Sequence, residues 1–394
     1  MALDTSNGSR HKADYTDFEH VGPGTLAGRY LRRFWQPLYR ADKLPPGQAK
    51  PVRLVGEDFT LYRGEGGTPH VVANRCAHRG TQLSTGWVEG DCLRCFYHGW
   101  KYDGSGQCTE MPAEDPSFPS KVRIASYPTE EYLGLIFVYL GGDAPPPLPR
   151  FPELEDESEG VREVYGYTWP CNYFQALEND PFHGDWVHRE SYLASGRTGT
   201  PQAVCEETDY GYVTHVTRPD ATQWPEAHMH FHMPNAVHTT RTAPELGKEA
   251  WREALTWRQA IDDDHFATFG VNFTHMAAEA REKYLARQQA RQERIAAFRP
   301  VPEMGEAVLR GEVRIQDLPE AKADSGWLFN IQDYVSQVGQ GRIVDRTQER
   351  LGRTDVSVIM LRKLWARELR ALAEGSPLKQ WARPVEALGV GRAR

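Results

Sequence analysis

Hydrophobic and polar positions divide the chain into a first part of short alternating runs and a second part that mixes strands with helices. Between residues 51 and 140, brief β-rich runs such as Pro51–Val55 and Phe59–Tyr62 are separated by turns that contain glycine. The most apolar stretch, Tyr132–Gly142, has about half of the roughly 20 residues that a membrane helix needs, which favours a buried strand. The first part is therefore predicted to be a small all-β unit.

A proline-rich segment separates the two parts. Ala144–Pro152 cannot continue a strand or a helix and stiffens the chain as polyproline, and an acidic stretch, 153–159, follows it. The pattern after this segment predicts a helical segment around 174–188, strands at 210–216, 228–233 and 270–273, and helices over 277–298 and 354–373. The chain is therefore predicted to be an α+β protein with a domain boundary near residue 150.

Composition and charge exclude several classes of protein. A chain of 394 residues exceeds the usual limit of about 250–300 residues for one core, so two domains are expected. The net charge of −8 is spread along the chain without a basic run, which argues against a nucleic acid partner. The first twenty residues lack the apolar stretch of a secretion signal, and no segment suits a membrane. With six cysteines and no export signal, a reducing compartment, the cytoplasm, is expected.

Four potential metal ligands lie on two short segments. Cys76-Ala-His78-Arg-Gly and Cys95-Phe-Tyr-His98-Gly-Trp each offer one thiolate and one imidazole. Two Cys and two His suit either zinc or a two-iron cluster. A zinc finger usually pairs Cys with Cys and His with His, whereas each segment here mixes the two types. The mixed order favours an iron–sulfur cluster, in which the thiolates hold one iron and the imidazoles hold the other.

These two segments resemble the Rieske [2Fe-2S] motif of ring-hydroxylating oxygenases, and Trp100 and Tyr102 fit that motif as well. A competing interpretation remains for Cys92, which forms a C-x2-C pair with Cys95 that would suit a redox dithiol or half of a zinc site. The cysteines without a partner at ligand spacing are expected to be buried thiols: Cys108, Cys171 and Cys205.

A second set of potential ligands follows the domain boundary. Asp180-Pro-Phe-His183-Gly184-Asp-Trp-Val-His188 carries two His five residues apart, which point into one space if Gly184 loosens the helical turn. Two His and one carboxylate form the facial arrangement of non-haem Fe(II) enzymes. Such a pair alone is more often structural. Its D-x2-H-x4-H pattern, placed after a Rieske motif, resembles the catalytic signature of the same oxygenase family.

The third iron ligand must come from elsewhere, and the resemblance points to Asp333, because the family draws this carboxylate from a late helix. The alternatives are the acidic group Asp262–Asp264 beside His265, and the single carboxylates Glu349 and Asp355. The resemblance also implies a catalytic role for Asp180. Its carboxylate is expected to connect the two metals by hydrogen bonds to His98 and His183.

The resemblance runs from about Gly28 to the helix after Asp355 and is closest to oxygenases of the phthalate and carbazole type. It implies three parts: an N-terminal segment, 1–36, that packs on the catalytic domain; a Rieske [2Fe-2S] domain, 37–150; and a catalytic mononuclear iron domain, 151–394, with an antiparallel sheet and helices of the helix-grip type. The sequence departs from the family in one respect. Members often have Asn three residues before the Asp of the iron motif, where Leu177 stands here.

The implied activity is that of an oxygenase component in aromatic catabolism. Electrons from a reductase or ferredoxin enter the cluster and pass to a mononuclear Fe(II), where O2 serves to cis-dihydroxylate or monooxygenate an aromatic substrate. Oxidative N- or O-demethylation is an alternative within the family, and a Rieske electron carrier without oxygenase activity is an alternative of another class. A homotrimer is also implied, because the two metal centres of one such chain are too far apart for fast electron transfer. The donor is expected to be a separate protein, because the sequence has no glycine-rich nucleotide fingerprint.

Several polar residues keep more than one interpretation. An alternating strand presents three imidazoles on one face, and these are expected either to line the substrate cavity or to be structural: His228, His230 and His232. Glu178 and Asn179 are expected either near the iron or in a capping or packing role. No role in binding an anionic substrate is assigned to Arg189, Arg218 or Arg241.

Overall fold

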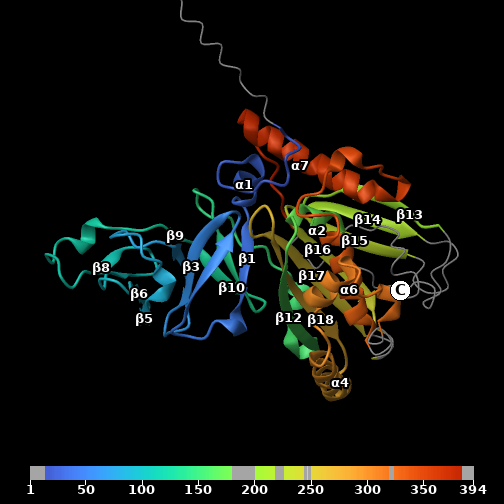
Figure 1. Cartoon of the computed structure of the whole chain (residues 1–394), viewed down its shortest axis with the longest axis horizontal. Coiled ribbons are helices and arrows are strands. Elements are labelled where there is room, and N and C mark those ends of the chain that lie inside the picture. The colour runs from blue at the N-terminus through green and yellow to red at the C-terminus, as the bar shows by residue number, and fades with distance from the viewer. Residues whose placement is uncertain are drawn as a thin grey trace, which may run out of the picture.

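The computed structural model describes residues 14–179, 200–217, 226–243, 246, 250–318 and 324–383. Within these ranges the chain forms a small all-β part beside a larger part in which helices cover a broad sheet (Figure 1). The predicted α+β class, with a small β domain and a larger domain of antiparallel sheet and helices, is confirmed. None of the described helices combines the length and the apolar character needed to cross a lipid bilayer.

Three small antiparallel sheets build the first part. The first has the order β1 (Trp35–Arg40), β11 (Leu135–Tyr139), β10 (Thr129–Tyr132). The second has the order β2 (Ala49–Leu54), β3 (Glu57–Arg63), β4 (Pro69–Ala73), β9 (Ser126–Tyr127). The third has the order β5 (Trp87–Glu89), β6 (Cys92–Arg94), β7 (Lys101–Tyr102), β8 (Cys108–Glu110). Buried Tyr62, Val72 and Leu93 share one core between the second and third sheets.

A seven-stranded antiparallel sheet forms the centre of the larger part. Its order is β12 (Gly160–Trp169), β18 (Phe266–His275), β17 (Trp251–Ala260), β16 (Ala236–Thr242), β15 (Glu226–His232), β14 (Gly211–Thr217), β13 (Gln202–Glu207). β12, β18 and β17 pair along ten residues each without a shift in register. This unbroken register gives the sheet two clearly separated faces, because side chains alternate along every strand.

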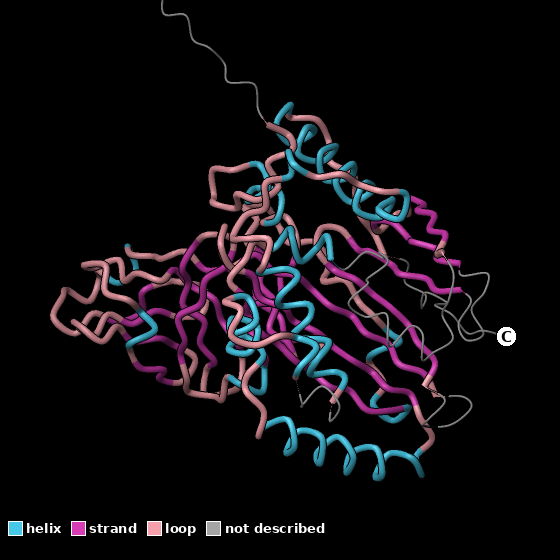
Figure 2. Tube along the Cα trace, turned by 45° about the vertical axis from the view of Figure 1, so that its right-hand side comes forward, coloured by secondary structure: helices cyan, strands magenta, loops and turns pink. Residues whose placement is uncertain are grey.

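The described helices lie mainly over one face of this sheet. They are α1 (Leu26–Leu31), α2 (Tyr173–Asn179), α4 (Ala278–Ala296), α5 (Val301–Leu309), α6 (Ser325–Val338) and α7 (Val356–Glu374). α2 packs against β17 and α6, and α7 packs against β13 and β14. Figure 2 shows helices in front of the long strands. Because helices cover this face, a site built from helix side chains can form between them and the sheet.

The two faces of the sheet belong to separate cores. On the helix face, Trp169 of β12 contacts Tyr334 of α6 at 5.3 Å and Phe266 of β18 at 5.8 Å between ring centroids. On the opposite face, Trp257 of β17 contacts Phe137 of β11 at 5.5 Å and Phe151 of the proline-rich segment at 6.1 Å. The second face is therefore covered by the small sheets and the segment that follows them.

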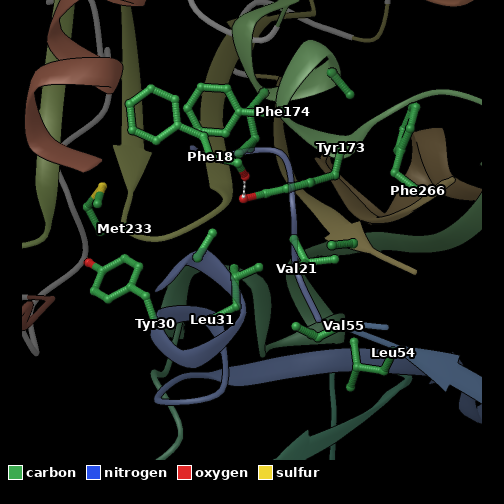
Figure 3. Packing of buried hydrophobic residues seen from close by; sticks show 14 of the residues in the cluster. Phe18, Val21, Tyr30, Leu31, Leu54, Val55, Tyr173, Phe174, Met233 and Phe266 are labelled. Carbon is green, nitrogen blue, oxygen red and sulfur yellow. Dashed lines mark hydrogen bonds between the residues drawn. The ribbon is translucent and has the colours of Figure 1, made fainter. Parts of the chain in front are cut away.

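The N-terminal segment is anchored in the aromatic core on the helix side. Phe18 stacks on Phe174 of α2 with centroids 4.6 Å apart, and the Tyr173 hydroxyl donates a hydrogen bond of 2.7 Å to the Phe18 carbonyl (Figure 3). Trp365 of α7 contacts Phe174 and Tyr30 at 5.5 and 5.1 Å. These contacts join α1, α2, α7 and the N-terminal segment into one cluster.

Several predicted elements match the structure, and one of them begins later than predicted. The helices predicted over 277–298 and 354–373 correspond to α4 and α7, and the strand predicted at 270–273 is the middle of β18. The buried strand predicted within Tyr132–Gly142 is β11, all five residues of which are buried, but it begins later, because a turn at Leu133 and Gly134, with φ of 52° and 79°, separates it from Tyr132, the last residue of β10. The turn is apolar because Leu133 is itself buried, so the composition of this segment hides it.

Replacing Trp365 with Ala is expected to destabilise the larger part strongly. The side chain is fully buried, and its indole N–H donates to the Pro234 carbonyl at 3.2 Å. A cavity of this size lowers the free energy of unfolding by about 3–5 kcal/mol. Ile359→Ala on the same helix, where the side chain is 48% exposed, should change it by less than about 0.5 kcal/mol. Urea unfolding followed by far-UV circular dichroism measures both, and equal midpoints would contradict this description of the core.

Candidate functional site

Two loops of the same design carry Cys76 and Cys95. The first joins β4 to β5 and the second joins β6 to β7, in the part of the small domain that Figure 1 shows away from the seven-stranded sheet. In each loop the cysteine carbonyl accepts a hydrogen bond from a glycine amide four residues later, Gly80 at 2.9 Å and Gly99 at 3.1 Å. Both glycines are left-handed, with φ of 75° and 74°, which disfavours any residue with a Cβ. Each loop therefore turns back tightly on its cysteine.

The loops bring two thiols together and two imidazoles together. Cys76 and Cys95 are buried. The pKa of the Cys95 thiol is raised mainly by burial, and the neighbouring Cys76 thiol raises it further. The rings of His78 and His98 lie 4.5 Å apart at 67°. The buried Nδ1 of His78 has no hydrogen-bond partner among the described residues. An unpartnered imidazole nitrogen beside a second imidazole fits the ligand set of a metal cluster.

Aromatic residues of the second loop and strand β7 fix these ligands. The Tyr102 hydroxyl lies 3.2 Å from the Cys76 sulfur and accepts a hydrogen bond of 3.2 Å from the Ala77 amide. Trp100 stacks on His78 with centroids 4.5 Å apart and planes at 9°. Each of the two predicted ligands of the first loop is therefore held by one aromatic side chain, Cys76 by Tyr102 and His78 by Trp100.

The ligand spacing does not suit a single zinc ion. Over the described ranges, one group of three or more Cys, His, Asp or Glu has all its ligand atoms within 4.8 Å of one another, and it is Glu153, His238 and Glu253. Ligand atoms around a tetrahedral zinc lie about 3.4–3.8 Å apart, so the two loops are too open for one ion. A cluster of two irons, with thiols at one end and imidazoles at the other, fits this wider spacing.

The imidazole end of the loops faces the surface. His98 is exposed, and three aromatic side chains around it are more than half exposed: Trp87, Phe96 and Tyr97. Trp87 and Phe96 contact each other at 5.8 Å, and Arg79 lies over the Tyr97 ring at 5.7 Å. An apolar rim around an exposed ligand is typical of a surface on which another protein binds.

The predicted iron ligands on the catalytic side are only partly described. Asp180, His183 and His188 lie outside the described residues, and so do Arg189 and Arg218. The helix α2 ends at Asn179, directly before them, and Gln175 of α2 donates a hydrogen bond of 3.1 Å to the Gln337 carbonyl of α6. Asp333 lies half-buried on α6. The residues directly before the iron motif and Asp333 therefore lie on neighbouring helices, and the ligand set itself stays a prediction.

The rival carboxylates are engaged elsewhere. Asp262, on the β17–β18 turn, bonds His265 Nδ1 at 3.0 Å, and the neighbouring Asp263 accepts the Val21 amide at 2.8 Å. Glu349 forms a two-point ion pair with Arg362 at 2.6 and 2.9 Å. A further carboxylate, Asp355, accepts the Gly352 amide at the start of α7. These contacts favour structural roles for all of them.

The residues around the iron motif that sequence left open have structural partners. Leu177 is fully buried in the core on the helix side, which explains an apolar side chain at the position where Asn is common. Glu178 pairs with Arg346 at 2.7 Å and with Arg362 at 2.5 Å. Arg241 lies exposed on β16. The ion pairs of Glu178 hold the last turn of α2, which supports the packing role for this residue.

The remaining cysteines have no feature of a reactive thiol. All six cysteines are free, and burial raises the pKa of Cys92 and of Cys108, and that of Cys171 to about 12. A raised pKa disfavours the thiolate that a redox dithiol needs. Cys108 and Cys171 are buried as predicted. Cys205 is only half-buried, and its sulfur contacts Thr214 and Ser357 at 3.2 and 3.4 Å.

The three histidines of β15 lie on the face of the sheet that is opposite α2 and α6. His230 pairs with His238 across β15 and β16, and His238 alternates with Val237, which belongs to the core on the helix side. His230 Nδ1 lies 2.6 Å from the Tyr210 hydroxyl, and the Nδ1 atoms of His228 and His215 lie 2.7 Å apart. The histidine ladder is therefore separated by the sheet from the predicted iron. No sequence spacing indicated that Glu153 and Glu253 would join His238 there.

A comparison with known protein families supports the prediction of a Rieske cluster in the small domain. Residues 34–128 match the family model of the Rieske [2Fe-2S] domain. This match contains both loops, and it confirms that the predicted cluster is of the Rieske type. Which side chains hold the irons remains a prediction from the motif and from the geometry described above.

Two curated relatives match most of the chain. The 5,5'-dehydrodivanillate O-demethylase oxygenase subunit of Sphingobium sp. (strain NBRC 103272 / SYK-6) is 32% identical over 381 residues, covering 91% of this chain and 80% of that protein. The phenoxybenzoate dioxygenase subunit alpha of Ectopseudomonas oleovorans is 29% identical over 380 residues, covering 90% and 84%. Both parts of the chain are therefore shared with oxygenase subunits.

Solved structures show the same fold. NdmA of Pseudomonas putida CBB5, as a QL mutant with caffeine, has a TM-score of 0.67 at 19% identity and covers 93% of this chain and 98% of that one. A substituted oxygenase in a complex with ferredoxin, from carbazole 1,9a-dioxygenase, has a TM-score of 0.61 at 19% identity and covers 92% and 95%.

The loop geometry, the Rieske domain match and the likeness to oxygenase subunits along nearly the whole chain agree with one another. Oxygenases of this kind combine the [2Fe-2S] cluster with a mononuclear iron, so both predicted cofactors are those of the family. The chain belongs to the Rieske oxygenases and is one of their catalytic oxygenase subunits.

Proposed function

We propose that this chain hydroxylates an aromatic compound with O2, using electrons from a separate ferredoxin or reductase. The observation that carries this proposal is the likeness of both parts of the chain to oxygenase subunits, because a simple electron carrier would need only the small domain. The two relatives described above are named for aromatic acids, dehydrodivanillate and phenoxybenzoate. An aromatic acid is therefore the substrate class we favour.

At the small domain, Cys76 and Cys95 would hold one iron and His78 and His98 the other. Such a cluster supplies one-electron transfer at a potential raised by its neutral imidazole ligands. The protein tunes that potential, because the Tyr102 hydroxyl can donate a hydrogen bond to the Cys76 sulfur and because the thiol side is buried. The exposed side chain of His98 gives the electron a way to the surface.

At the larger domain, His183, His188 and Asp333 are the proposed ligands of a mononuclear Fe(II), which supplies the activation of O2. The chain's own contribution is rigidity. Ion pairs of Glu178 fix the last turn of α2 just before the motif, and Tyr334, the neighbour of Asp333, is buried against Trp169. Ligands on fixed helices would keep the distance and the orientation between the iron and the bound substrate constant.

We also propose a head-to-tail homotrimer in the cytoplasm. The strands β5–β8 lie at the far side of the small domain from α2 and α6 (Figure 1), so electron transfer within one chain would have to cross both domains. In a ring of subunits the cluster of one chain can lie against the larger domain of the next. Asp180 would then hydrogen-bond to His183 of its own chain and to a cluster imidazole of the neighbouring chain.

O-demethylation is a second candidate, favoured by the relative that is 32% identical and named as an O-demethylase oxygenase subunit. One oxygen atom of O2 enters a methyl C–H bond of an aryl methyl ether, and the other leaves as water after two electrons and two protons are taken up. The product of this hydroxylation is a hemiacetal. It loses the bond between its CH2 carbon and the aryl oxygen and releases formaldehyde and a phenol. The same site performs either reaction, according to which substrate atom faces the iron.

Labelled dioxygen separates these candidates. The purified chain, a ferredoxin–reductase pair and a panel of aromatic acids, with and without methoxy groups, are incubated with ¹⁸O2 and analysed by mass spectrometry. Two labels in one product indicate dihydroxylation, one label indicates monooxygenation, and labelled formaldehyde with an unlabelled phenol indicates O-demethylation. About three irons per chain are expected. Two irons and no product from any compound would instead support the electron carrier.

Tyr102→Phe is expected to lower the reduction potential of the cluster. Loss of one hydrogen bond to a ligand sulfur is worth about 1 kcal/mol, which corresponds to about 40 mV for one electron. Tyr97→Phe is the matched control, because its ring is more than half exposed on the second loop, whereas Tyr102 is buried on β7. Protein-film voltammetry measures both variants. An unchanged potential in Tyr102→Phe would show that this hydroxyl does not act on the cluster.

Asp180→Asn is expected to keep both metal centres and to abolish product formation coupled to electron donation. An amide retains the size of the side chain but accepts and donates hydrogen bonds differently from a carboxylate, so the connection between His183 and the cluster imidazole is lost. Iron content and the visible spectrum verify the centres, and product formed per electron consumed is the readout. Near-normal product formation in this variant would refute the role of Asp180.

A further inference from the structure

The face of the seven-stranded sheet that lies away from α2 and α6 holds a second group of potential metal ligands. Glu153 belongs to a short 3-10 turn after the proline-rich segment, His238 to β16 and Glu253 to β17. One ligand atom from each lies within 4.8 Å of those of the other two. We propose that Glu153, His238 and Glu253, named here the linker cluster, bind a divalent transition-metal cation that is distinct from both iron centres of the proposed function.

The hydrogen bonding of His238 leaves a place for a cation. Its side chain is fully buried between two carboxylates, with Nε2 at 2.9 Å from Glu253 and Nδ1 at 3.6 Å from Glu153. A separation of 3.6 Å is too long for a hydrogen bond, so a proton on Nδ1 does not explain the contact. Two ligand atoms of one tetrahedral zinc lie about 3.4 Å apart, which is close to the observed separation.

The buried atoms around this contact are unpartnered within the described part of the chain. They are Nδ1 of His238, Oε2 of Glu153 and both ring nitrogens of His275. His275, at the end of β18, is 5% exposed, and its Nε2 lies 3.4 Å from Glu253. Buried polar atoms in native proteins nearly always have a partner, so the unpartnered Nδ1 of His238 and Oε2 of Glu153, on two side chains of the linker cluster, point to a bound species.

The charges of the linker cluster also favour a cation. Two buried carboxylates are balanced by one guanidinium, that of Arg383, which pairs with Glu153 and donates to the Arg150 carbonyl at 2.9 Å. The acidic side chains of the group thus outnumber its guanidinium. Buried charge of one sign is costly unless it is paired or coordinates a metal.

The donor types define the class of cation. One or two imidazoles with two carboxylates suit Zn²⁺, Fe²⁺, Mn²⁺ or Co²⁺ better than a soft monovalent ion or an alkaline-earth ion. A cavity of about 670 Å³ lies nearby, and its lining includes Arg383, the ion-pair partner of Glu153. Because Glu153 belongs to the segment between the domains, the bound cation would tie that segment to β16 and β17.

Zinc binding in the absence of the catalytic iron site tests this proposal. The background is the holoprotein with His183→Ala and His188→Ala and its [2Fe-2S] cluster in place. Equilibrium dialysis against Zn²⁺, read by mass spectrometry of the metal, should give one Zn²⁺ per chain. Glu153→Gln, His238→Gln or Glu253→Gln in this background should each weaken binding by about tenfold or more. The matched control is Glu163→Gln on β12, whose carboxylate accepts a hydrogen bond from Tyr284 and should not affect binding.

The visible spectrum of the cluster and the thermal midpoint without zinc verify that each variant is folded. If one variant is unfolded, the other two variants test the same proposal. Zn²⁺ should raise the thermal midpoint of the background protein but not that of the folded variants. A background that binds no Zn²⁺, or variants that bind it as tightly as the background, would overturn the proposal. The result is independent of the proposed function, because failure of His183 and His188 as iron ligands would appear as an unchanged iron content in the background.

Discussion

The alternation of side chains across the seven-stranded sheet is the constraint on which the rest of the structure depends. β12, β18 and β17 pair over ten residues each without a slip, so every second side chain is committed to the same face. One face packs against α2 and α6, where the catalytic iron is proposed, and the other packs against the small sheets and the linker. A shift of one residue in one strand would exchange Glu253 and Leu255 for residues of the helix face. Asp333 on α6 and the linker cluster therefore lie on opposite sides of this sheet.

In the small domain the predicted ligands are positioned by loops and not by the register of strands. Gly80 and Gly99 close two turns of equal size, and Trp100 and Tyr102 extend from the second loop and β7 to the ligands of the first. The thiol end is thereby buried and the imidazole end exposed. This polarity suits a centre that receives electrons at the surface, where the exposed ring of Tyr97 contacts His98.

Sequence predicted the features that depend on short spacing and missed those that depend on pairing between distant segments. The two Cys–His loops and the helices α4 and α7 could be predicted because every determinant lies within about twenty residues. The spacing of buried Trp327, Ile331 and Tyr334 would also have outlined α6. By contrast, nothing local connects Glu153 with His238 and Glu253, which meet only through the register of β16 and β17 and the path of the linker. The ion pairs of Glu178 with Arg346 and Arg362 were hidden for the same reason.

The central claim is that a histidine-ligated [2Fe-2S] cluster in the small domain serves a separate mononuclear iron in the larger one. Electron paramagnetic resonance of the anaerobically purified, dithionite-reduced protein tests it most directly. The account predicts the rhombic signal of a Rieske cluster, retained when His183 and His188 are both replaced with Ala while about one iron per chain is lost. Absence of that signal, or zinc in place of iron at the two loops, would contradict the account.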